Sequence, residues 1–208
     1  MMGSVAVSTY DRSVASGGFS LTIEPGHEEI WFAIRDVTKL FSAEDLARAA
    51  GASLSKVEFY LAKLVRHGVL QMYAHTTDQK RLYKIEKLAI TPMVLDEQGR
   101  PSADFAKRQA LWSTVRIRKT FTETELWQLV REHVVITRKH VTEFIRRMLA
   151  AGYICELFGK GREGETEYQL KPAMNTGRIP PRFCEATLAY DINQRQFYGV
   201  GLAREVML

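Results

Sequence analysis

Four polar residues with hydrogen-bonding or cationic side chains recur along one stretch of the chain. They are Arg138, Lys139, Thr142 and Arg146. Arginine and lysine donate hydrogen bonds to the acceptors that base edges present in the major groove of duplex DNA, and a threonine methyl can contact the thymine methyl. These residue types therefore predict non-covalent recognition of a nucleic acid.

A helix must position these four side chains. Thr137 is suited to cap its start, and Gly152 is suited to a left-handed position after its end. The apolar residues recur at helical spacing, at Val141, Phe144, Ile145, Met148 and Leu149. The four polar residues fall on the opposite face of this amphipathic helix.

A strand-like segment and a charged turn follow the glycine. The turn, residues 159–164, reads Gly-Lys-Gly-Arg-Glu-Gly and carries Lys160 and Arg162. A flexible turn with two cations suits phosphates or the minor groove beside the helix.

The first half of the chain shows the same order of elements. We expect a first helix from Glu28 to Phe41, a second at 43–50 after the cap Ser42, and a third that opens at Ser53 or Ser55 and runs to His67. Residues 69–75 and 81–87 then resemble two strands of a hairpin.

An internal repeat relates the two halves. Residues 37–46 match residues 117–126 at an offset of 80, with an aromatic, a cap residue, acids and a leucine in step. The third helix matches at an offset of 84 and the outer strand of the hairpin at 85. We interpret this as a tandem duplication of one fold.

The first copy differs in its third helix. Lys56, Lys63 and Arg66 are cations that can contact phosphates. The middle of this helix, however, offers Glu58 and Phe59, an acid and an aromatic that suit a protein contact. The sequence leaves DNA and a protein partner equally open for the first copy.

Composition narrows the class of protein. A net charge of +5 and a pI of about 9.2 favour a polyanionic partner, and residues 104–172 alone carry 13 Lys+Arg against 9 Asp+Glu. The two cysteines and five histidines lack metal-ligand spacing, and no nucleophile or phosphate-loop motif occurs. We therefore expect no metal, no cofactor and no enzymatic activity, and no apolar run suggests a membrane, so we expect a cytoplasmic protein.

Five segments are predicted from these patterns. Residues 1–27 form an N-terminal arm, 28–90 a first domain, 91–103 a linker and 104–172 a second domain. Residues 173–208 form a C-terminal segment that packs on a domain or on a second subunit.

Ser42 through Leu70, and again Thr122 through Ile154, resemble prokaryotic winged helix-turn-helix DNA-binding proteins. The resemblance implies an α+β fold, mostly α with β-hairpins, in two tandem winged helix-turn-helix domains. It implies binding of double-stranded DNA, as in transcription regulators or phage and plasmid replication initiators. Tandem winged helices also grip proteins in bacterial condensins, so a homodimer or another protein partner stays open.

Overall fold

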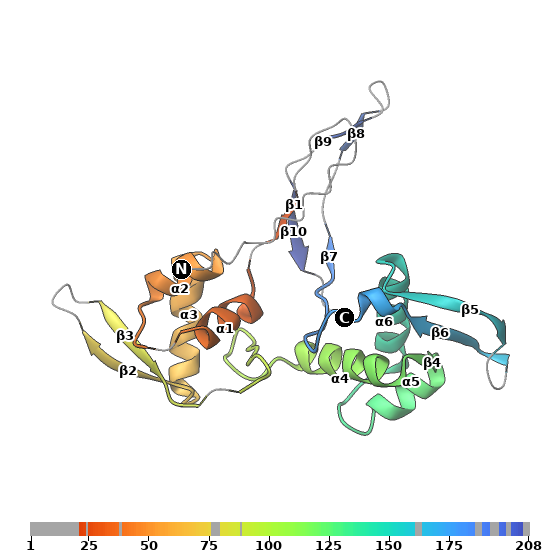
Figure 1. Cartoon of the computed structure of the whole chain (residues 1–208), viewed down its shortest axis with the longest axis horizontal. Helices are drawn as coiled ribbons and strands as arrows, with labels where there is room; N and C mark the ends of the chain where they lie inside the picture. Colours follow the sequence, from red (N-terminus) through yellow and green to blue (C-terminus); the bar gives the residue numbers. More distant parts are fainter. Residues whose placement is uncertain are drawn as a thin grey trace. The chain divides into compact units, whose positions relative to one another are not determined.

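The computed structural model describes residues 21–23, 25–37, 39–75, 80–87, 89–160, 164–185, 189–191, 196–198 and 201–205. The chain divides into two compact units (Figure 1). One unit contains Met1–Pro101 with Cys184–Arg204, and the other contains Ser102–Phe183 with Glu205–Leu208. Each unit holds one domain of three helices and a hairpin.

The first domain has the order helix, helix, helix, hairpin. Its elements are α1 (His27–Arg35), α2 (Ala43–Ala50), α3 (Leu54–Arg66), β2 (Leu70–His75) and β3 (Arg81–Ile85). The strands pair antiparallel, from Leu70 opposite Ile85 to His75 opposite Arg81. This arrangement is a winged helix-turn-helix domain.

The second domain repeats the order and adds a short strand. Its elements are α4 (Ala103–Arg118), β4 (Thr120–Thr122), α5 (Glu123–Val130), α6 (Arg138–Ala150), β5 (Ile154–Lys160) and β6 (Thr166–Leu170), followed by the 3₁₀ turn η2 (Pro172–Met174). The sheet order is β4-β6-β5. The predicted fold class, α+β with two tandem winged helices, is confirmed.

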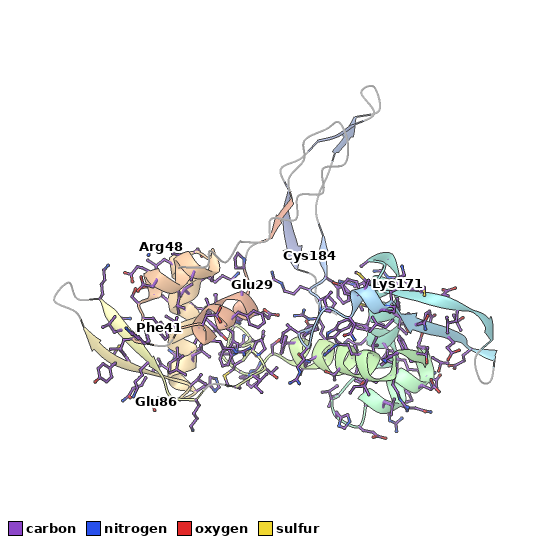
Figure 2. All side chains as sticks on the ribbon, viewed as in Figure 1. Glu29, Phe41, Arg48, Glu86, Lys171 and Cys184 are labelled. Atoms are coloured by element: carbon purple, nitrogen blue, oxygen red, sulfur yellow. The ribbon has the colours of Figure 1, made fainter. Side chains whose placement is uncertain are left out.

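Residues that the repeat matches in sequence occupy equivalent places in the two domains. Phe41 bridges Tyr83, and Phe121 pairs with Tyr168. The ring centroids lie 6.0 Å apart in the first pair and 5.9 Å apart in the second. Figure 2 shows Phe41 in the first domain, between the helices and the hairpin.

The helix ends are equivalent as well. Ser42 and Thr122 each cap the following helix by accepting from the backbone N–H three residues on. Gly68 and Gly152, which follow α3 and α6, have φ of +64° and +73°. Only glycine adopts this left-handed conformation without strain, so the sequence ends both helices in the same way.

Each domain has its own apolar core. The core of the first is built on Ile30, Trp31, Ile34, Val57, Leu61 and Leu64. The core of the second is built on Leu111, Trp112, Val141, Phe144, Ile145 and Met148. The buried face of α6 is the predicted one, and the cations of its opposite face are thereby turned to solvent.

The prediction for the first helix was wrong at its end. Helical spacing of apolar residues continues to Phe41, but α1 ends at Arg35. The backbone of Phe41 instead exchanges hydrogen bonds with Tyr83, at 3.2 Å and 2.9 Å. This strand-like pairing requires the chain to leave the helix before residue 41.

Residues 91–103, predicted as a linker, include a segment that packs on the first domain. Leu95 is buried, and its N–H donates to Nδ1 of His27 at 3.2 Å. The hydroxyl of Tyr60 donates to the carbonyl oxygen of Met93 at 2.7 Å. His27 stacks on Tyr60, with 4.2 Å between ring centroids.

Segments from both ends of the sequence share a small sheet. Strand β1 (Leu21–Ile23) runs parallel to β10 (Gly201–Glu205), which also pairs with β7 (Cys184–Glu185). Strands β8 (Ala189–Asp191) and β9 (Gln196–Tyr198) form a separate antiparallel pair. Among the helices that the structure describes, none has both the length and the apolar character needed to cross a bilayer.

Candidate nucleic-acid interface

The first turn of α6 carries two exposed cations of the predicted site. Thr137 precedes the helix in an extended conformation, and its hydroxyl lies 2.6 Å from Nδ1 of His140. Arg138 and Lys139 follow and are both exposed. Their position matches the end of a recognition helix that contacts base edges in helix-turn-helix proteins.

An indole ring orients Arg138. The guanidinium carbon of Arg138 lies 4.6 Å from the centroid of the Trp127 ring, and that of Arg131 lies 4.5 Å from it. Cations near an aromatic face are attracted by its quadrupole. Trp127 and Arg131 were not among the predicted site residues, although their spacing of four residues in a helix would have indicated the contact.

The hydroxyl of Thr142 is engaged within the domain. It lies 2.7 Å from Oε1 of Glu123, to which it can donate, and 3.1 Å from the carbonyl oxygen of Arg138. Glu123 is the first residue of α5, so the two helices of the helix-turn-helix are joined here. Thr142 itself is exposed, which leaves its methyl group as the predicted contact with a thymine.

Arg146 is exposed but ion-paired. Its Nε and Nη2 donate to the two carboxylate oxygens of Glu143 at 2.7 Å and 2.6 Å, and Nε of Arg147 donates to Oε1 at 2.5 Å. The hydrogen bonds from Arg146, and then those from Arg147, lower the pKa of Glu143 to about 2. Glu143 is therefore ionised at neutral pH and holds Arg146 along the helix.

A polar cleft of about 340 Å³ lies beside α6. It is lined by Glu123, Thr124, Arg138, Gly164, Glu165, Thr166 and Tyr168. Glu165 accepts from the hydroxyl of Thr124 at 2.5 Å and from its N–H at 3.4 Å, and the hydroxyl bond is the main cause of a lowered pKa for this carboxyl. A carboxylate thus lies at the start of α5, beside α6. The positively charged surface of the second domain is therefore smaller than its excess of Lys and Arg over Asp and Glu indicates.

The wing of the second domain is the hairpin of β5 and β6 with the turn between them, and the structure describes it only in part. Lys160 is the last residue of β5, and its side chain lies outside the described residues, as does the whole of Arg162. Their predicted contacts with the DNA backbone stay predictions.

In the first domain, the prediction that Lys63 contacts phosphate does not fit the structure. Only 4% of Lys63 is exposed, and its Nζ donates to the carbonyl oxygen of Asp96 at 2.6 Å. Burial lowers the pKa of this ammonium. The ammonium of Lys63 instead links α3 to the segment that contains Asp96.

The other predicted residues of α3 lie closer to solvent. Arg66 is exposed and Lys56 is half-buried, so both remain candidates for phosphate contacts. Glu58 is exposed, and Phe59 is 55% exposed with Nζ of Lys63 3.8 Å from its ring centroid. The ammonium covers one face of the ring, and the predicted protein contact through Glu58 and Phe59 stays a prediction.

The fold and these faces define a protein of two winged helix-turn-helix domains. No protein-family model and no curated protein matches the chain. Among solved structures, the chain is similar to the crystal structure of ScpB from Mycobacterium tuberculosis, with 16% identity over 73% of this chain and 96% of that chain. The TM-score is 0.26, so this similarity supports no functional argument.

Proposed function

We propose that the chain binds double-stranded DNA through its second domain, with the first turns of α6 in the major groove. The observation that carries this proposal is the pair of exposed cations, Arg138 and Lys139, at the start of the second helix of a helix-turn-helix. This is the part of a recognition helix that reaches base edges. Regulation of transcription at specific sites is the cellular role that we propose.

The cations have different tasks in this proposal. Arg138 and Lys139 read bases, and the methyl group of Thr142 contacts thymine. Arg146 joins them when phosphate or a base replaces Glu143 as its acceptor. Lys160 and Arg162 hold the backbone beside the helix.

The first domain adds affinity in the same proposal. Lys56 and Arg66 supply sequence-independent phosphate contacts, and Lys63 does not take part because it is buried. One chain then carries two DNA-binding domains, so a second subunit is not required for an extended site.

Substitution of Arg138 tests this proposal. If Arg138 reads a base, R138A weakens binding to a duplex selected from random sequence by about 1–3 kcal/mol and reduces discrimination between selected and random duplexes. The assay is fluorescence anisotropy with the full chain. R118A is the matched control, because Arg118 is an exposed arginine at the end of α4, outside α6 and the wing.

Two results separate the alternatives. Equal weakening on every duplex makes Arg138 a phosphate contact and removes base reading by this residue. Unchanged binding in R138A, with R118A as the reference, contradicts the placement of α6 in the groove.

A further inference from the structure

The two domains differ at one edge of the hairpin. In the second domain, β4 pairs with β6 at three positions, Thr120–Gln169, Phe121–Tyr168 and Thr122–Glu167. In the first domain, the equivalent pairing among the described residues is a single bridge between Phe41 and Tyr83. Leu40 and Lys84, which correspond to Thr120 and Gln169 in the repeat, are not joined by this bridge.

A groove lies at this edge of the first domain, where the described residues make only the single bridge. Because α1 ends at Arg35, residues 37, 39 and 40 lie outside any helix or strand, beside the hairpin. The groove has a volume of about 360 Å³ and is lined by Val37, Lys39, Leu40, Tyr73, Lys84 and Ile85.

The groove has an apolar floor that is open to solvent. Leu40 is 40% exposed and Tyr73 is 60% exposed, with Val37 and Ile85 half-buried between the loop and the hairpin. Clustered exposed apolar side chains beside polar ones mark interaction sites more often than isolated ones do. Tyrosine is also among the residues that most often dominate binding energy at interfaces.

The charge of the rim identifies the kind of partner. Lys39 and Lys84 are both exposed, and no carboxylate is among the lining residues. Lys84 has an ion pair with Glu86 at 3.8 Å, but both side chains are largely exposed, so this pair is weak and exchangeable. Two ammonium groups over an apolar floor complement a ligand that is acidic and carries an apolar side chain.

We propose that this groove binds a short acidic segment of a partner protein, which inserts one apolar side chain between Leu40 and Tyr73 and places carboxylates against Lys39 and Lys84. A protein segment satisfies both the floor and the rim. DNA phosphates satisfy only the lysines and leave the apolar floor without a partner. This site is independent of α6, so its failure and the failure of DNA binding are separate results.

The test is a selection of displayed random peptide segments on the full chain. Segments with acidic residues around a leucine, isoleucine or phenylalanine are expected to be enriched. A fluorescein-labelled copy of an enriched segment then gives affinities. Y73S weakens its binding about tenfold, as loss of an interface anchor does, whereas F32S leaves it unchanged. Phe32 is the matched control, because it is an exposed aromatic in the same domain, outside the groove.

Charge reversal tests the rim separately. The double variant K39E, K84E binds the acidic segment more weakly than the wild type does. A copy of the segment with lysines in place of its acids binds more tightly to the double variant than to the wild type.

Four results overturn the proposal. They are enrichment of segments without acids, enrichment that Y73S does not affect, self-association of the chain that Y73S abolishes, and a shallower salt dependence of DNA binding in K39E, K84E. The third assigns the groove to a second copy of the chain, and the fourth assigns it to DNA.

Discussion

Neutralising Glu143 is expected to strengthen DNA binding. In the free protein its carboxylate holds Arg146 by two hydrogen bonds of 2.7 Å and 2.6 Å. Arg146 must leave this acceptor before it contacts DNA. The variant E143Q keeps the size of the side chain, removes its charge and ends the charge-assisted pairing.

The size of the effect follows from the exposure of the pair. The side chain of Arg146 is 64% exposed and that of Glu143 is 29% exposed. Pairs in contact with solvent are worth about 0.2–1 kcal/mol, so their release raises affinity at most about fivefold. If Arg146 stays paired with Glu143 in the wild-type complex and contacts a phosphate only in E143Q, the slope of log affinity against log salt also steepens by about 0.9.

Anisotropy with one selected duplex over a salt series measures both quantities. E97Q is the matched control, because Glu97 is an exposed carboxylate in the other unit and its substitution changes the net charge equally. An affinity and slope for E143Q equal to those of E97Q would refute the reasoning that Glu143 competes with DNA for Arg146.

Three further predictions concern stability. K63M lowers the unfolding free energy of the first domain by about 1.5–3 kcal/mol, because it removes a charged donor from the carbonyl of Asp96. It leaves the slope of log affinity for DNA against log salt unchanged. Urea unfolding measures the first effect and the salt series the second, and a shallower slope would contradict the burial of Lys63. Burial, then Lys63, lowers the pKa of His27 from 6.5 to about 4, so the unfolded chain binds more protons and stability falls as pH drops from 6.5 towards 4. An NMR titration midpoint near 6.5 would be incompatible with the stacked, half-buried ring. G152A and G68A each cost about 1 kcal/mol or more in thermal or urea unfolding because φ is positive, and unchanged stability would argue against the left-handed helix ends.

Local rules explain why much of the fold could be predicted. Caps such as Ser42, terminating glycines such as Gly152 and the apolar face of α6 depend on residues within a few positions of one another. The end of α1 does not depend on nearby residues alone, because it is decided by the pairing of Phe41 with Tyr83, 42 residues away in the sequence. This long-range contact overrides the helical pattern of residues 36–41.

The candidate site also combines contacts between residues that are near in the sequence and contacts between residues that are distant in it. The pairing of Arg146 with Glu143 spans three residues, so helical spacing alone could have predicted it, although the sequence analysis did not name it. The contact of Thr142 with Glu123 spans 19 residues, and that of Lys63 with Asp96 spans 33. The sequence identified the cations of both helices, but only the fold shows which of them face solvent.

Binding of the wild-type chain to selected and random duplexes over a salt series tests the central claim most directly. We expect a selected duplex to bind far more tightly than random DNA, with a slope of about −0.9 for each phosphate contact. Binding that is absent near physiological salt, or equal for every sequence, would contradict site-specific recognition by α6.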